Sequence, residues 1–131
     1  MLLDTSGLFS YFDQGDANHA RAAELFDAAD ALLTHSYVLA EFLPLCNARR
    51  LNRTAYLAFA AELLESPVVE IVWVDEALHR AAFALVQARQ DKTYSLCDAV
   101  SFVLMRERGI HKALTTDKHF EQEGFQRLLT P

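Results

Sequence analysis

The sequence contains few of the residues that interrupt or cross-link a chain, with 4 Gly, 3 Pro and 2 Cys among 131 residues. No Pro- or Gly-rich linker, low-complexity segment or internal repeat divides it, and its length suits one domain, so we expect a single domain over residues 1–131. Cys46 and Cys97 lie on different predicted helices without metal-ligand spacing. This arrangement predicts reduced, semi-buried thiols rather than a disulfide or a zinc site.

Long hydrophobic runs are also missing, although 52% of the residues are hydrophobic. No apolar stretch approaches the roughly 20 residues that span a bilayer. Met1 leads directly into a strand-like segment, without the basic region, apolar core and cleavage site of a secretory signal. We therefore expect a soluble, cytoplasmic protein.

Positive charge is in deficit, since 12 basic residues face 18 acidic ones for a net charge of -6. Proteins that passively coat nucleic acid usually present a basic face, so this balance argues against that class. It leaves a nuclease open, because bound divalent cations can offset acidic residues at a site.

Strand and helix signals alternate along the chain, which is the pattern of an α/β fold with about five strands. The expected strands cover residues 2–4, 31–34, 68–74, 113–115 and 125–129. Expected helix N-caps are Ser6, Asp16, Ser36, Asn52 or Thr54, Asp75 and Ser95, and Gly109 is the expected stop of the helix that follows Ser95. Strands joined by helical crossovers form a mostly parallel sheet, which binds ligands beyond the carboxyl ends of its strands.

Four acids stand at strand ends or near helix starts within apolar sequence: Asp4, Glu41, Asp98 and Asp117. Acids are rarely buried unless they are paired or coordinate a metal. The expected topology brings the four toward one rim of the sheet, so they form the candidate site.

Each acid also has a structural alternative. Asp4 and Asp117 could form Asx-turns or caps. Asp98 has the strongest alternative, because Ser95 three residues before it completes a capping-box spacing. Glu41 has the weakest, since it lies past the first turn of its predicted helix among apolar neighbours, where burial without a partner would be costly. The joint pattern favours a functional set.

Four motifs resemble those of the PIN-domain ribonucleases, and especially the VapC-like toxins of bacterial toxin–antitoxin pairs. They are Leu-Asp-Thr-Ser at 3–6, Val-Leu-Ala-Glu at 38–41, the run from Tyr94 to Phe102, and the run from Leu114 to Phe120. The resemblance covers nearly the whole chain and implies a three-layer α/β/α fold around a mostly parallel sheet. It implies that the four acids are the catalytic and metal-binding set, with Thr5, Ser6, Thr115 and Thr116 as polar neighbours.

The same resemblance implies an endoribonuclease that hydrolyses single-stranded or structured RNA, together with a small antitoxin partner, a homodimer and no membrane association. Carboxylates suit Mg²⁺ or Mn²⁺, whereas a set without convergent His or Cys suits zinc poorly, and one or two ions remain open. Arg49, Arg50 and Lys92 could steer the RNA backbone or be ordinary surface charges.

The sequence also bears on an alternative function, on His119 and on Pro44. A degenerate PIN domain that only binds protein or RNA is the alternative function, and an aspartyl-phosphate phosphotransferase is disfavoured because position 6 is Ser6 rather than aspartate. His119 is interpreted as a surface residue at a helix start. Pro44 is expected to kink the helix that carries Glu41, because it removes a backbone donor.

Overall fold

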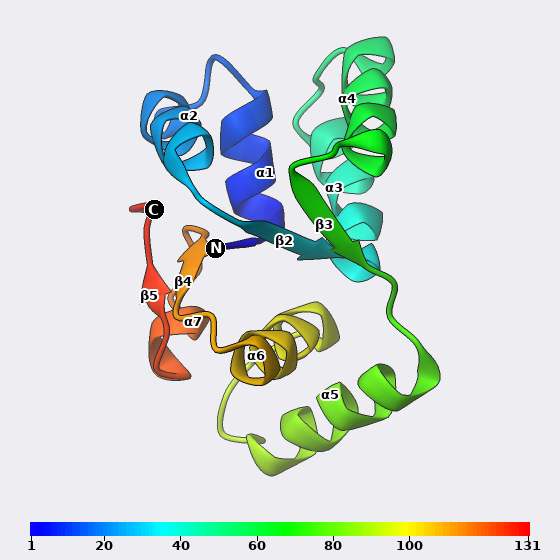
Figure 1. Ribbon diagram of the computed structural model, residues 1–131, viewed down its shortest axis with the longest axis vertical. Coiled ribbons are helices and arrows are strands. Elements are labelled where there is room, and N and C mark those ends of the chain that lie inside the picture. The colour runs from blue at the N-terminus through cyan, green and yellow to red at the C-terminus, as the bar shows by residue number, and fades with distance from the viewer.

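A five-stranded parallel sheet with the order β3-β2-β1-β4-β5 forms the centre of the computed structural model, which describes residues 1–131 (Figure 1). Its strands are β1 (Leu2–Leu3), β2 (Leu32–His35), β3 (Val69–Val72), β4 (Lys112–Leu114) and β5 (Gln126–Arg127). Each overlaps a strand expected from the sequence. The predicted parallel sheet is confirmed.

Helices cover both faces of this sheet (Figure 1). They are α1 (Thr5–Phe12), α2 (His19–Ala28), α3 (Ser36–Ala48), α4 (Arg53–Glu65), α5 (Glu76–Ala88), α6 (Leu96–Arg108) and α7 (His119–Gln122). The first four lie over one face, whereas α5 and α6 lie over the other, with α7 packed against α6 and β5. The expected three-layer α/β/α architecture is confirmed.

Side chains of the two central strands alternate between these layers because successive strand residues point to opposite faces. Leu3 and Leu114 enter the core beneath α1 and α3. Leu2 and Ala113 enter the opposite core, where they meet Phe102 of α6. Strands β1 and β4 are thus buried on both faces. This packing holds in place the edge of the sheet at their carboxyl ends, which we call the rim.

Several helix boundaries follow directly from local sequence. Asn52 caps α4 by accepting a 2.9 Å hydrogen bond from a backbone N–H, and Asp75 caps α5 through a 2.8 Å bond. Ser95 caps α6, and Gly109 ends that helix in the left-handed conformation with φ of 64°. These predicted caps and the predicted stop are confirmed, because side-chain and backbone groups a few residues apart decide them.

Two expected caps in the amino-terminal part are wrong. Ser6 lies inside α1, which begins after Asp4, because the Ser6 hydroxyl is engaged by the segment that follows β4. Asp16 precedes α2 by a turn and accepts the backbone N–H of Asn18 at 3.0 Å instead of capping the helix. The Ser6 hydroxyl is used in a long-range contact, whereas the Asp16 carboxylate is used in a local turn.

The cap of α3 also differs from the expected Ser36. His35 is the N-cap residue, and the Ser36 hydroxyl instead accepts a 2.9 Å hydrogen bond from the backbone N–H of Val74. This bond ties the start of α3 to the segment after β3. The helix assignment continues through Pro44, and the expected kink there stays a prediction.

The two cysteines are free and buried on α3 and α6, as predicted for separate reduced thiols. Burial raises the pKa of both thiols, to about 11 for Cys46. Neither thiol is therefore a ready nucleophile. No helix of the structure combines the length and the apolar character needed to cross a membrane.

Candidate active site at the carboxyl ends of the central strands

The sheet changes direction of winding between β1 and β4. From β1 the chain continues to β2 on one side, whereas β4 continues to β5 on the other. Asp4 follows β1 directly and Asp117 follows β4 by three residues, so both stand outside the carboxyl ends at this point. Such a switch point is where open α/β sheets bind ligands.

A close approach of α1 to β4 holds the two halves of this rim together. A Cβ atom on Gly7 would lie 1.9 Å from the backbone oxygen of Leu114, so only glycine fits there. Beside it, the Ser6 and Thr115 hydroxyls are 3.1 Å apart, and Ser6 Oγ accepts the Thr116 backbone N–H at 3.0 Å. These predicted polar neighbours join α1 to the segment after β4.

Asp4 is almost fully buried, with 5% of its surface exposed. Thr115 donates a 2.7 Å hydrogen bond from its hydroxyl to Asp4 Oδ2. Burial raises the pKa of the Asp4 carboxyl to about 7; the Thr115 bond opposes this rise, and the charges of Asp98 and Asp117 add to it. The hydrogen bonds to Asp4 therefore do not fully offset the cost of burying its charge. A buried carboxylate of this kind is suited to bind a cation.

Glu41 lies in the second turn of α3 and is exposed. The expectation that it would be buried among apolar neighbours is wrong, because α3 turns this position toward the rim rather than the core. Thr5 donates a 2.9 Å hydrogen bond from its hydroxyl to Glu41 Oε1. That bond ties the Glu41 carboxylate to the residue next to Asp4, so Thr5 connects α1 to the acid on α3.

Asp98 serves as both a capping residue and a site residue. Its Oδ2 accepts the Ser95 backbone N–H at 3.0 Å, and the Ser95 hydroxyl accepts the Asp98 N–H, also at 3.0 Å. The same Oδ2 lies 3.2 Å from His119 Nδ1. Burial raises the pKa of Asp98, with the Ser95 bond opposing and Asp117 reinforcing the rise. The capping alternative is therefore real and compatible with a place in the site.

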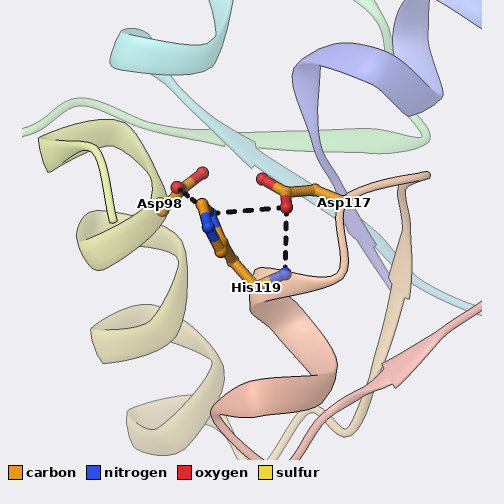
Figure 2. A group of neighbouring side chains, drawn as sticks. All are labelled: Asp98, Asp117 and His119. Atoms are coloured by element: carbon orange, nitrogen blue, oxygen red, sulfur yellow. Dashed lines mark hydrogen bonds and ion pairs between the residues drawn. The ribbon is translucent and has the colours of Figure 1, made fainter. Parts of the chain in front are cut away.

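Asp117 meets Asp98 across the side chain of His119 (Figure 2). Asp117 Oδ1 accepts the His119 backbone N–H at 2.9 Å, which is an Asx-turn, and lies 3.4 Å from His119 Nδ1. The Asp117 N–H donates to Thr115 Oγ1 at 3.0 Å. Thr115 thus contacts both Asp4 and Asp117, which connects the acids that follow the two central strands.

His119 is a residue of the candidate site that the sequence interpretation missed. Its side chain is only 17% exposed and stands between the carboxylates of Asp98 and Asp117, so the interpretation as a surface residue is wrong. Asp98 is distant in sequence, and only the packing of α7 against α6 brings it near. The spacing of Asp117 and His119, two residues apart at a helix start, was the available signal.

The donor set fits a divalent cation. One ligand atom from each of Asp98, Asp117 and His119 lies within 4.8 Å of the others. Asp4 and Glu41 join no group of three at this spacing, but Asp4 interacts with Asp98 and Asp117 through charge. A bound cation reduces the electrostatic repulsion between crowded carboxylates, which adds to the effect of burial in raising the pKa values of Asp4 and Asp98. Asp98, Asp117 and His119 would therefore hold the ion, with Asp4 beside it.

The predicted RNA-steering residues lie at different distances from this rim. Arg49 and Arg50 follow the carboxyl end of α3, eight and nine residues beyond Glu41, which corresponds to roughly 12 Å along the helix. Lys92 precedes Thr93, whose hydroxyl is 3.1 Å from His119 Nε2. Among the three, Lys92 therefore directly precedes a residue that contacts the site.

Known proteins resemble this chain in sequence and in fold. The PIN domain family matches residues 1–125, and the chain belongs to the PIN domain family. Over 126 residues it is 33% identical to the 23S rRNA-specific endonuclease VapC20 of Mycobacterium tuberculosis (strain ATCC 25618 / H37Rv), covering 95% of each chain. It is 35% identical over 122 residues to ribonuclease VapC26 of the same strain, covering 92% of this chain and 89% of that protein.

The crystal structure of Mycobacterium tuberculosis VapC20, described as a sarcin–ricin loop cleaving toxin, superposes with a TM-score of 0.87. The match has 32% sequence identity and covers 99% of this chain and 98% of that one. The resemblance to PIN-domain ribonucleases and VapC-like toxins that the four motifs indicated is confirmed.

Proposed function

We propose that this chain is a Mg²⁺- or Mn²⁺-dependent endoribonuclease that hydrolyses phosphodiester bonds of RNA and acts as the toxin of a toxin–antitoxin pair. The observation that carries the proposal is the set of carboxylates at the β1/β4 switch point of a PIN-domain fold. The nuclease names of relatives that align over nearly the whole chain support it.

Each of the four acids has its own role in this proposal. Asp98 and Asp117 would hold the ion, Asp4 would complete its charge balance, and Glu41 would face the open side of the rim. Hydroxyls orient the carboxylates of Asp4 and Glu41, because Thr115 and Thr5 donate to one oxygen of each. When bound, the ion supplies Lewis-acid chemistry and neutralises charge on phosphate oxygens.

The substrate is inferred from the activities for which the relatives are named. One is named as an endonuclease specific for 23S rRNA and its structure as a sarcin–ricin loop cleaving toxin. We therefore propose structured ribosomal RNA as the substrate class, with Lys92, Arg49 and Arg50 as contacts for its backbone. An acidic site repels phosphate unless a cation is present, so RNA binding at the rim should depend on the metal.

Partners would use the exposed apolar side chains. On α4, Leu57 is 39% exposed and Leu64 is 49% exposed. Trp73, which precedes α5, is 66% exposed, and Phe83 on α5 is 51% exposed. These residues support an antitoxin contact and a homodimer contact, since exposed apolar clusters mark interaction surfaces. We further propose that residues 1–131 act as one domain in the cytoplasm, where both free thiols stay reduced.

The test is RNA cleavage by the purified chain. Ribosomal RNA containing the sarcin–ricin loop and an unrelated single-stranded RNA are incubated with Mg²⁺, Mn²⁺ or EDTA. We expect cleavage with either ion, none with EDTA, and none by Asp98→Asn, which keeps the side-chain shape while removing its charge. Asp75→Asn is the matched control, because Asp75 accepts a backbone N–H at the start of α5, as Asp98 does at the start of α6, but belongs to no acidic group of the site.

Thermal unfolding separates a catalytic role from a capping role. Asp98→Ala removes the Asp98 half of the α6 capping box and should cost on the order of 1 kcal/mol in the free energy of unfolding. A folded Asp98→Asn protein that cleaves RNA at the parental rate would contradict the catalytic assignment. Absence of metal-dependent cleavage by the parent chain on both RNAs would favour the degenerate PIN domain that only binds protein or RNA.

A further inference from the structure

His119 is a nitrogen donor among the carboxylates of the rim (Figure 2). Its Nδ1 lies 3.2 Å from Asp98 Oδ2 and 3.4 Å from Asp117 Oδ1. Neighbouring ligand atoms of an octahedral ion with bonds of about 2.1 Å are separated by roughly 3.0 Å. The separations from His119 Nδ1 to the two carboxylate oxygens are therefore already close to those between neighbouring ligands of one ion.

Contacts on the other side of the ring set its orientation. His119 Nε2 lies 3.1 Å from Thr93 Oγ1, and the Tyr94 ring meets the imidazole edge-to-face with centroids 5.2 Å apart. A histidine that ligates a metal through one nitrogen is usually oriented by a hydrogen bond at the other. The Thr93 and Tyr94 contacts thus direct Nδ1 at Asp98 and Asp117.

The short helix that carries His119 is itself held in place. Glu123, directly after α7, is bound by two arginines, with Oε1 2.9 Å from Arg89 Nε and Oε2 2.5 Å from an Arg106 terminal nitrogen. The Glu123 side chain is 3% exposed, whereas the side chains of Arg89 and Arg106 are 40% and 47% exposed and cover it from the solvent side. This double ion pair fixes α7 against the ends of α5 and α6, which keeps the imidazole at the rim.

We propose that His119 Nδ1 is a ligand of the divalent ion and makes the site prefer Mn²⁺ to Mg²⁺. This rests on the proposed function, in which Asp98 and Asp117 hold the ion. Mg²⁺ favours oxygen ligands and dehydrates reluctantly, whereas imidazole is a better ligand for first-row transition metals. A set made only of carboxylates would distinguish the two ions less.

Calorimetric titration with Mn²⁺ and with Mg²⁺ tests the selectivity. The variants are His119→Ala and His119→Asn, whose amide keeps a polar atom near Nδ1 without the imidazole nitrogen. His111→Asn is the matched control, because His111 is exposed and precedes β4 at the opposite rim of the sheet. We expect both His119 variants to lose at least about tenfold in Mn²⁺ affinity and to change much less in Mg²⁺ affinity, with the control unchanged.

Pulsed electron paramagnetic resonance of bound Mn²⁺ tests ligation directly. We expect coupling to an imidazole nitrogen in the parent and in His111→Asn, and its loss in His119→Asn, with circular dichroism confirming that each variant is folded. Mn²⁺ bound to the parent without nitrogen coupling would overturn the ligand assignment and leave the proposed function intact. Equal losses for both ions in the His119 variants would overturn the selectivity, and a parent that binds neither ion would overturn the metal-dependent function itself.

Discussion

At the scale of single residues, two acids of the candidate site also hold the local structure together. Asp98 completes the capping box of α6, and Asp117 closes an Asx-turn, yet both face His119. A carboxylate has two oxygens and several lone pairs, so it can accept a backbone N–H and still meet a cation. A structural role for an acid in this fold is therefore no argument against a functional one.

His35 provides a separate pH-dependent contribution to stability. It is fully buried, its Nε2 lies 2.8 Å from Ser101 Oγ, and its Nδ1 accepts the Val38 N–H at the start of α3. Burial lowers the pKa of His35 to about 4 from a model-compound value of 6.5. Because the folded-state pKa is depressed, the stability is present above pH 6.5 and is lost as pH falls toward 4.

This loss should approach roughly 3 kcal/mol at full protonation, from about 1.36 kcal/mol for each unit of pKa shift. Asp4 acts in the opposite sense, since its raised pKa means that stability is lost as pH rises toward 7. We expect Asp4→Asn, measured without metal by urea unfolding, to lose stability more steeply than the parent between pH 6.5 and 4. A His35 ring proton that titrates near pH 6.5 in NMR spectra would contradict this prediction.

At the scale of elements, the site depends on how closely α1 packs against β4. Gly7 allows the approach, and the two residues before it on α1 make the contacts: Thr5 with Glu41, and Ser6 with the segment after β4. A clash here involves backbone atoms of a central strand, which cannot move aside as a side-chain tip can. The helix would have to shift, and Thr5 and Ser6 would shift with it.

We expect Gly7→Ala to destabilise the fold by roughly 1–3 kcal/mol, the range for overpacked positions, and to lower RNA cleavage in the folded fraction. Gly15→Ala is the control, because its nearest neighbour is an Asp13 carboxylate oxygen at 3.4 Å, an ordinary contact. Urea unfolding and the cleavage assay measure the two effects. Parental stability in Gly7→Ala would show that α1 does not sit as close to β4 as described.

At the scale of the whole molecule, the strand order gathers acids from the full length of the chain. Asp4 and Asp117 are more than a hundred residues apart, yet they flank adjacent strands because β1 pairs with β4. Their mutual repulsion and burial are a cost to the metal-free fold. Binding of a cation should therefore appear as added stability of the whole domain.

We expect Mn²⁺ at 100 times its dissociation constant to stabilise the protein by about 2.7 kcal/mol, measured by calorimetric unfolding, and EDTA to reverse the gain. Asp4→Asn should lose most of this gain and, without metal at pH 7.5, should be more stable than the parent because it lacks the buried charge. Asp27→Asn, at an exposed position on α2, should behave like the parent. Unchanged stabilisation by Mn²⁺ in Asp4→Asn would remove Asp4 from the metal site.

The sequence by itself determined the features that depend on near neighbours. The caps at Asn52, Asp75 and Ser95, the stop at Gly109 and the five strands follow from local hydrogen-bonding groups and β-branched or apolar runs. The four acids could also be selected, since charge in apolar sequence next to an element boundary is visible without a structure.

Only the tertiary structure decided which groups meet at the rim. Packing of α7 on α6 places His119 beside Asp98, and the approach of α1 to β4 turns Ser6 from an expected cap into a partner of Thr115. The same packing leaves Glu41 exposed rather than buried. These outcomes depend on distances between segments far apart in the chain, and periodicity and capping patterns carry no information about such distances.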